Sequence, residues 1–272
     1  MGNLPGVPTL TEDRYSAALP AQTGQLAALL DAATDADLGR QVPSCPDWNL
    51  RELAEHVGRG HRFAQDVVRR RVSGPAELAA PGTHPTPDDP AGLGGWLTEG
   101  AGALRTAVRA AGADPVWNFT GVPGTGGFWL RRMVHETAVH RADAALTVGA
   151  PFTLDADLAA DAITEWLELV TSPGARSRGG RPDLVETMRG DGQRLHLHST
   201  DDGLGEAGEW LIRRGPDGAS WEHGHEKGDV AVRGTATDLL LVLVGRIGPD
   251  DERLQVFGDA ALLEHWVRHV YF

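Results

Sequence analysis

The sequence has almost no thiols. Its 272 residues include one cysteine, Cys45, so the chain can form neither an intramolecular disulfide nor a Cys-rich zinc knuckle. A single cysteine is consistent with a reducing compartment, and we expect a cytoplasmic protein. Any bound metal ion must therefore be held by histidine and carboxylate side chains.

The sequence also lacks long apolar runs and clusters of basic residues. No stretch approaches the roughly 18 apolar residues that a membrane span needs, and no basic-then-apolar start resembles a signal peptide. The formal net charge is -13, from 25 Lys+Arg against 38 Asp+Glu, and it repels phosphate backbones and anionic membrane surfaces. We therefore expect no nucleic-acid partner and no membrane partner.

The length of the chain predicts two modules, because 272 residues is a little under twice a typical domain length. In the first half, apolar side chains recur at helical spacing and strand-like alternation is nearly absent. The expected helices span residues 11–33, 50–72, 91–111 and 128–148. Four helices of this size predict a bundle. Gly149 is a stop signal for the fourth helix, so we place the two domains at residues 1–150 and 151–272.

The second domain mixes helices and strands. Residues 194–199 and 210–214 alternate polar and apolar side chains, and we expect them to form a hairpin. Further strands are expected at residues 230–233 and 254–257, and helices at 155–170, 238–246 and 259–270. Two segments rich in glycine and proline, at 74–90 and 172–182, are expected to be connections. The predicted fold class is α+β, with a helical bundle followed by a smaller α/β domain.

The fourth helix carries a polar stripe. His135 and His140 superficially resemble the histidines of an HExxH zinc protease, but they are five residues apart and cannot face one metal ion on a helix. Glu136 and His140 are four residues apart, which is the spacing at which two side chains can share an ion. Arg132 and Asp143 extend the stripe along a helix that should be buried. Burying so many polar groups is costly unless they are paired or bind something.

A third potential ligand lies on the second helix. His56 falls mid-helix among Leu53, Ala54 and Val57, where the usual explanation is a core histidine with its hydrogen bonds satisfied. Bundles build metal sites from inward carboxylates and imidazoles on facing helices. Two histidines and one glutamate with an open position form the catalytic kind of zinc site. A salt-bridged or solvated stripe remains the alternative for this set.

Three segments of the sequence resemble one protein family. Val42–Trp48 with Leu50–Val57, together with Arg132–Asp143, closely resemble the mycothiol-dependent maleylpyruvate isomerase family within the DinB-like metal-binding bundles. Val232–Leu241 with Gly245 and Arg246 is similar to the C-terminal domain of that family, which has a sterol-carrier-like (SCP2-like) α/β character. The resemblance implies a DinB-like four-helix bundle followed by this smaller domain. Asp47 departs from the family, whose members usually have glycine before the tryptophan.

The resemblance also implies a site and an activity. The family's metal ligands fall on His56, Glu136 and His140, which would hold a divalent ion, usually zinc, with mycothiol or a similar low-molecular-weight thiol replacing a bound water. Arg246 matches an arginine for an anionic substrate, for which a bidentate guanidinium is suited. Such an enzyme acts on a small electrophile as an isomerase or as a thiol S-transferase. The alternative is a non-catalytic metal- or ligand-binding protein with the same bundle.

Other residues admit a functional and a simpler interpretation. Cys45 could be a nucleophile, but a small residue packed in a proline-rich loop is the simpler explanation because the sequence shows no adjacent base. Asp143 is a plausible acceptor for a ligand histidine. His61 is about 140° around the helix from His56, so we expect it on the surface.

Four histidines of the second domain could form another metal site. His196 and His198 point to the same face of one strand, and His223 and His225 follow nearby. Because the first two alternate with leucine, the simpler interpretation is a solvated strand face.

Overall fold

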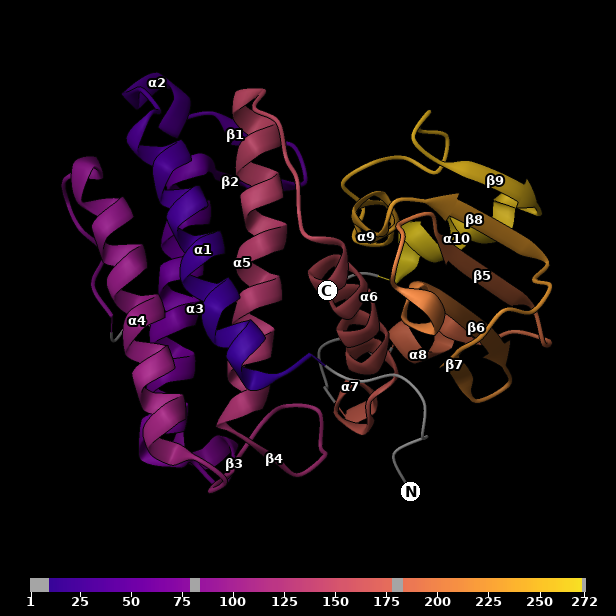
Figure 1. Cartoon of the computed structure of the whole chain (residues 1–272), viewed down its shortest axis with the longest axis horizontal. Coiled ribbons are helices and arrows are strands. Elements are labelled where there is room, and N and C mark those ends of the chain that lie inside the picture. Colours follow the sequence, from indigo (N-terminus) through magenta and orange to yellow (C-terminus); the bar gives the residue numbers. More distant parts are fainter. Residues whose placement is uncertain (1–9, 79–83, 178–182, 271–272) are drawn as a thin grey trace. The chain divides into compact units, whose positions relative to one another are not determined.

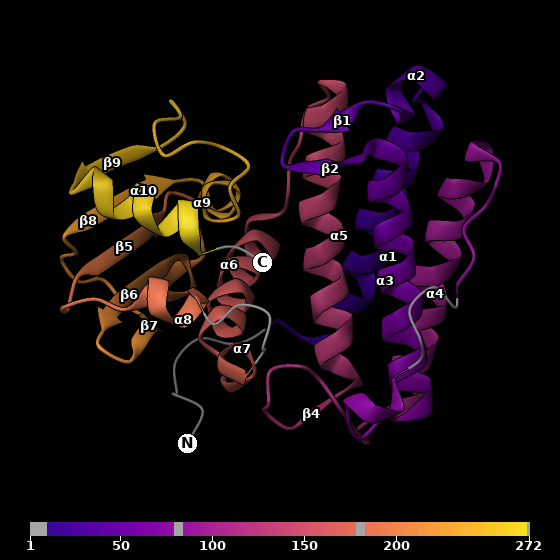
Figure 2. The same ribbon diagram turned by 180° about the vertical axis from the view of Figure 1, so that it is seen from behind.

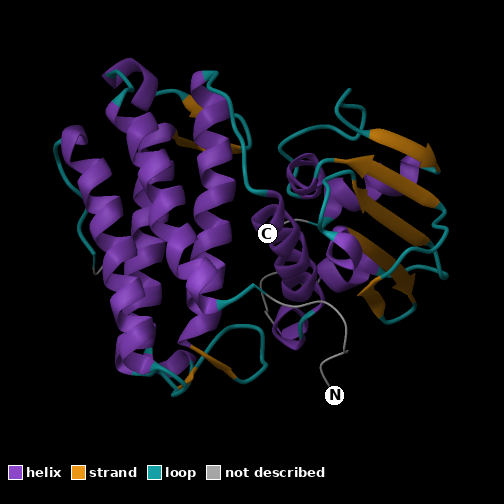
Figure 3. Ribbon diagram, viewed as in Figure 1, coloured by secondary structure: helices purple, strands orange, loops and turns teal. Residues whose placement is uncertain are grey.

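The computed structural model describes residues 10–78, 84–177 and 183–270 of the chain. Residues 79–83 and 178–182, which belong to the two expected connections, lie outside this part. The described residues form two compact units: one is Thr11–Phe152, and the other is Leu10 with the described residues from Thr153 onward. The first unit is almost wholly helical and the second contains a sheet, which confirms the predicted α+β class (Figures 1 and 3).

The first unit is a bundle of four long helices that lie side by side (Figures 1 and 2). They are α1 (Glu12–Asp31), α3 (Leu50–Arg70), α4 (Leu93–Ala111) and α5 (Gly126–Val148). The shorter elements are α2 (Asp35–Leu38), β1 (Gln41–Val42), β2 (Cys45–Asn49), two 3-10 turns (Pro75–Glu77 and Pro90–Gly92), β3 (Pro115–Val116) and β4 (Gly124–Thr125). All four predicted helices are confirmed, with ends shifted by a few residues.

The segment before α3 differs from the prediction. The proline-rich segment around Cys45, residues 42–48, was expected to be a loop, but β1 and β2 form a small antiparallel hairpin in which Val42 is the partner of Cys45. The hairpin ends at Asn49, whose side chain accepts a hydrogen bond from the Glu52 amide, while the Glu52 carboxylate accepts one from the Asn49 amide. These two hydrogen bonds form a capping box, which stabilises the first turn of a helix. The hairpin is thereby joined directly to α3.

The helices pack closely where residues are small. Leu53, Ala54 and Val57 are buried in the apolar core together with Leu26 and Leu30 of α1. At Gly58, a Cβ atom would lie 1.9 Å from the Trp96 ring of α4, so only glycine permits this approach. Packing of this kind fixes the rotation of α3 and hence the direction of its polar side chains.

The second unit contains a five-stranded sheet of order β7-β6-β5-β8-β9. Its strands are β5 (Arg194–Ser199), β6 (Glu209–Gly215), β7 (Gly218–His223), β8 (Val230–Gly234) and β9 (Gln255–Gly258). Its helices are α6 (Ala156–Thr171), α7 (Pro173–Ser177), α8 (Asp183–Met188), α9 (Ala236–Leu243) and α10 (Ala260–His269), with a 3-10 turn at Gly205–Gly208. β5 pairs with β6 antiparallel and with β8 parallel.

Most predicted elements of this unit are confirmed, and several details differ. The expected pairing of residues 194–199 with 210–214 is present as β5 and β6. The prediction missed β7, α8 and also α7, which lies inside a segment expected to be a connection. α9 ends three residues earlier than expected because Gly245 adopts a left-handed conformation with φ 73°.

None of the helices in the described part of the chain is both long and apolar enough to cross a membrane.

The expectation that His61 lies on the surface is wrong. Its side chain is buried, and its Nε2 lies 2.8 Å from the Thr137 hydroxyl oxygen of α5. That hydroxyl donates to the Met133 carbonyl, so it accepts from a neutral His61 protonated at Nε2. Burial is the main reason that the pKa of His61 falls from 6.5 to about 4.

The burial of His61 predicts a pH dependence of stability. Between pH 6.5 and 4 the unfolded chain binds a proton that the folded chain does not, so acidification favours unfolding. We expect this residue to remove about 3 kcal/mol of unfolding free energy over that range. Urea unfolding of His61→Gln should therefore show a shallower loss of stability with falling pH than the wild type. The exposed His269 gives a control: His269→Gln should leave the slope unchanged, and equal slopes in all three proteins would refute the explanation.

Candidate metal centre

Side chains from α3 and α5 meet at one point of the bundle. The Nε2 atom of His56 lies 3.1 Å from Glu136 Oε1, and the Nε2 atom of His140 lies 3.2 Å from the same oxygen. The two imidazole rings have centroids 5.0 Å apart and are nearly perpendicular. The structure therefore brings together the three residues singled out from the sequence. His135 does not join them and packs edge-on against Tyr15.

The spacing of the three side chains suits a metal ion. One donor atom from each of the three residues lies within 4.8 Å of the other two. Ligands of a tetrahedral zinc ion, with bonds of about 2.0–2.1 Å, are about 3.3 Å apart. The observed separations from Glu136 Oε1 are close to this value, and two imidazoles with one carboxylate are donors that zinc accepts. The donor set and its spacing thus fit a divalent transition metal.

The three side chains are open to solvent on one side. The exposed fraction of the side chain is 37% for His56 and 27% for Glu136, but 10% for His140. His140 is thus the anchored member, and an external molecule can reach the other two. An accessible position of this kind distinguishes catalytic from structural zinc sites.

Arg132 fixes the charge of Glu136. Its guanidinium lies 2.5 Å from Glu136 Oε2, which leaves Oε1 for the two histidines. Burial alone would raise the pKa of Glu136, but Arg132 and the hydrogen bonds from His140 and His56 hold it well below its usual value. Glu136 is therefore an anion at neutral pH, as a metal ligand must be.

Asp143 orients His140. Its carboxylate is fully buried, and Oδ2 lies 2.8 Å from His140 Nδ1. Burial opposes protonation of His140, yet the hydrogen bonds with Asp143 and Glu136 raise its pKa from 6.5 to about 9. Coordination through Nε2 therefore requires the loss of one proton, while Nδ1–H stays on Asp143. A carboxylate in this position commonly sets the orientation and tautomer of a ligand histidine.

The β1–β2 hairpin adds contacts to the site that the sequence did not predict. The Ser44 hydroxyl donates to Asp143 Oδ1 at 2.5 Å, and the Trp48 ring lies 4.5 Å from the His56 ring. Cys45 Sγ lies 4.0 Å from Asp143 Oδ2, so the only cysteine is next to the site. Asp47 is exposed. The sequence signalled this segment by its position directly before the His56 helix and by its part in the family resemblance.

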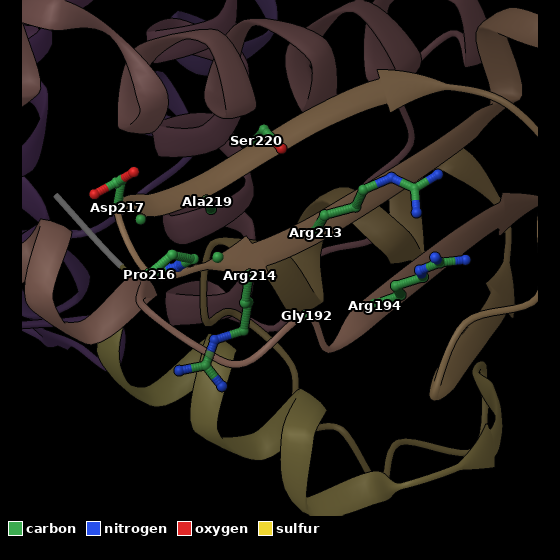
Figure 4. Close-up of a pocket in the computed structure, with 10 residues that line it drawn as sticks. Gly192, Arg194, Arg213, Arg214, Pro216, Asp217, Ala219 and Ser220 are labelled. Atoms are coloured by element: carbon green, nitrogen blue, oxygen red, sulfur yellow. The ribbon is translucent and has the colours of Figure 1, made fainter.

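The second unit contains Arg246 and a separate hollow. Arg246 follows α9, is half-buried and donates to the Val244 carbonyl at 2.5 Å. The hollow lies at the β6–β7 turn and is lined in part by Arg194, Arg213 and Arg214 (Figure 4). Arg194 and Arg213 form ion pairs with Glu226, and Arg214 points in another direction. The three guanidinium groups therefore do not converge on one ligand position.

Comparisons with known proteins agree for both halves of the chain. Residues 19–145 match the model of the mycothiol maleylpyruvate isomerase N-terminal domain, and residues 157–265 match the MDMPI C-terminal domain. The fold is similar to a crystal structure of the mycothiol-dependent maleylpyruvate isomerase, with 14% identity, a TM-score of 0.57, and coverage of 91% of this chain and 93% of that chain. A histidine-to-alanine mutant of that enzyme gives the same identity and coverage, with a TM-score of 0.56. A search of curated protein sequences gives no match.

The geometry predicts that Glu136 and His140 bind a metal ion. After chelator treatment and reloading, Glu136→Ala and His140→Ala should each hold one equivalent of Zn²⁺ less than the wild type, by elemental analysis of gel-filtered protein. Asp143→Asn should keep the ligands but weaken zinc binding about 10–100-fold, because His140 loses its orienting carboxylate.

Asp66 of α3 provides the control, since its carboxylate pairs with Arg69 and Arg70 and with neither histidine. Asp66→Asn should bind zinc as the wild type does. The protein should carry no polyhistidine tag, which would bind zinc itself. Unchanged zinc content in both alanine variants would refute the site.

Proposed function

Because the chain belongs to the mycothiol-dependent maleylpyruvate isomerase family, we propose that it is a metal-dependent isomerase. It would use mycothiol or a similar low-molecular-weight thiol to isomerise a small, acidic electrophile. The observation that carries the proposal is the convergence of His56, Glu136 and His140 on one solvent-accessible point. Zinc is the expected ion, since the donors are two imidazoles and one carboxylate.

The three converging residues would hold the ion, and other side chains would hold them in place. A bound divalent metal would act as a Lewis acid that lowers the pKa of a coordinating thiol, so that thiolate is available at neutral pH. Arg132 keeps Glu136 ionised through Oε2, and Asp143 keeps His140 Nε2 directed at Glu136 Oε1. These contacts prepare the donor set before any substrate arrives.

The protein's own thiol is a poor substitute for an external one. Cys45 Sγ lies beside Asp143 Oδ2, and a buried carboxylate repels a thiolate. The accessible side of the centre is formed instead by His56 and Glu136. A small thiol from solution would approach there. This arrangement supports the use of an external thiol, and not Cys45, as the nucleophile.

Arg246 is proposed to bind the carboxylate of the substrate. This assignment rests on the family resemblance and on the suitability of a guanidinium for bidentate contact with a carboxylate. The guanidinium is half-buried and donates to the Val244 carbonyl, so part of its hydrogen-bonding capacity is already used. Its role in binding is separate from metal coordination and can be tested separately.

A direct assay would decide between isomerisation and the other activities. We expect the zinc-loaded chain to convert a cis-configured unsaturated oxo acid, such as maleylpyruvate, to its trans isomer in the presence of mycothiol. The thiol should be regenerated, so mass spectrometry should find no accumulating S-conjugate. Glu136→Ala and His140→Ala should abolish conversion, and Asp66→Asn should retain it.

Two other outcomes of this assay would overturn the proposal. Accumulation of an S-conjugate with loss of free thiol would identify an S-transferase. If a panel of electrophiles gives neither isomerisation nor thiol consumption, while zinc is bound, the chain is a metal-binding protein without this activity.

The role of Arg246 predicts a selective effect on substrate binding. Removing a charge-assisted hydrogen bond costs about 1.5–3 kcal/mol, so Arg246→Ala should raise KM for the acidic substrate about 10–100-fold. Arg246→Lys should be intermediate, because lysine keeps the charge and loses the bidentate geometry. A neutral ester of the same substrate should be affected little. An equal loss for acid and ester would refute carboxylate binding.

A further inference from the structure

Four potential metal ligands lie together on the sheet of the second unit. They are His196, His198, Glu209 and His225, and we call them the histidine cluster. A solvated strand face was expected for the two histidines of β5, but His196 is only 5% exposed, so that expectation is wrong for this residue. A buried imidazole needs hydrogen-bonding or metal partners. Glu209 supplies one such partner, and the rings of His198 and His225 pack against His196.

The register of the sheet places three members on one face. His196 and His198 are two residues apart on β5, and His198 is the direct cross-strand partner of Glu209 on β6. Side chains in these positions point to the same side of a sheet. Leu197 and its partner Trp210 point to the other side, where the Trp210 indole donates to Thr164 of α6. The cluster therefore occupies the face of the sheet opposite α6, on adjacent strands.

The fourth member comes from the segment that joins β7 to β8. The Asp229 amide donates to the Arg194 carbonyl, and the Asp229 carboxylate accepts from the Arg194 amide, so the end of this segment is tied to β5. At Gly228, a Cβ atom would lie 2.6 Å from the Val230 carbonyl oxygen and 3.0 Å from that of Arg194. The close path of the chain thus requires glycine there, and it delivers His225 to Glu209.

The three histidines of the cluster converge on the Glu209 carboxylate. His196 Nε2 lies 2.6 Å from Oε2, while His198 Nδ1 and His225 Nδ1 lie 2.7 and 3.1 Å from Oε1. All four donor atoms are within 4.8 Å of one another. The ring centroids of the three histidines are 5.0–6.0 Å apart. Three imidazoles from two chain segments around one carboxylate form a compact set of nitrogen and oxygen donors.

We propose that the histidine cluster binds a divalent transition-metal ion, with zinc as the first choice. Imidazole suits zinc, copper and nickel, whereas calcium and magnesium prefer oxygen ligands. Four protein donors complete a tetrahedral shell, so the site is structural and cross-links β5, β6 and the β7–β8 connection. Donor separations in such a shell are about 3.3 Å, and the four donor atoms already lie within 4.8 Å of one another, so side-chain shifts of about 1.5 Å or less would complete it. The proposal does not depend on the proposed function, because it uses none of the residues of the bundle centre.

The test counts zinc equivalents in the full chain. The starting protein is the untagged Glu136→Ala/His140→Ala variant, stripped with chelator, in which the bundle ligands are removed. Calorimetric titration with Zn²⁺ should find one remaining equivalent. Adding His225→Ala should weaken this binding at least about tenfold. His225 is 72% exposed, so its replacement should leave the fold intact, as circular dichroism can verify.

His223 provides the matched control. It lies two residues from His225, but its Nδ1 contacts the backbone carbonyl of Glu209 and not the carboxylate. His223→Ala in the same background should still bind one equivalent, and His198→Ala should lose it. Reloading with Co²⁺ should give the strong visible bands of tetrahedral cobalt in the control and not in the His225→Ala protein.

The outcomes separate this proposal from the proposed function. If the starting variant binds no zinc, or if His198→Ala and His225→Ala both retain it, the proposal is overturned and hydrogen bonds alone hold the cluster. If the wild type binds one equivalent and the starting variant still binds one, the histidine cluster is supported and the bundle centre is refuted.

Discussion

The candidate metal centre of the bundle depends on the ionised carboxylate of Glu136 and its contacts with three neighbouring side chains. One carboxylate oxygen takes the Arg132 guanidinium, and the other faces the Nε2 atoms of His56 and His140. Without this charge, α3 and α5 would present two imidazoles to each other with no anion between them. Arg132 keeps the carboxylate ionised despite partial burial, so the geometry and the charge are maintained by the same contact.

A second line of contacts connects the centre to the rest of the unit. His140 is held by Asp143, which is held in turn by Ser44 of the β1–β2 hairpin. The hairpin leads directly into α3 through the capping box of Asn49 and Glu52. The local structure that starts the His56 helix therefore also places the side chain that orients His140. A disturbance of the hairpin would reach both histidines, which are on different helices.

The sequence allowed prediction of what depends on local spacing. Helical periodicity predicted α3 and α5, and the four-residue separation of Glu136 and His140 predicted their shared direction. Local spacing does not predict contacts between distant segments, such as the hydrogen bond between Ser44 and Asp143, which are 99 residues apart. The β1–β2 hairpin was also missed, because its two prolines are typical of a loop. His61 shows a further limit. Its position about 140° around α3 from His56 predicts that the two side chains point in different directions. It does not predict that a neighbouring helix buries the side chain of His61 as well.

The two groups of histidines offer the same kinds of donor atoms, but one is carried by helices and the other by strands of a sheet. In the bundle, a helix holds two donors four residues apart and a facing helix adds a third, which leaves one side of His56 and Glu136 accessible. On the sheet, strand alternation and cross-strand pairing align three donors, and a tightly constrained connection adds the fourth. Three donors leave a coordination position for an external thiol, whereas four do not. The number of donors therefore argues for a catalytic metal ion in the bundle and for a structural, cross-linking metal ion on the sheet.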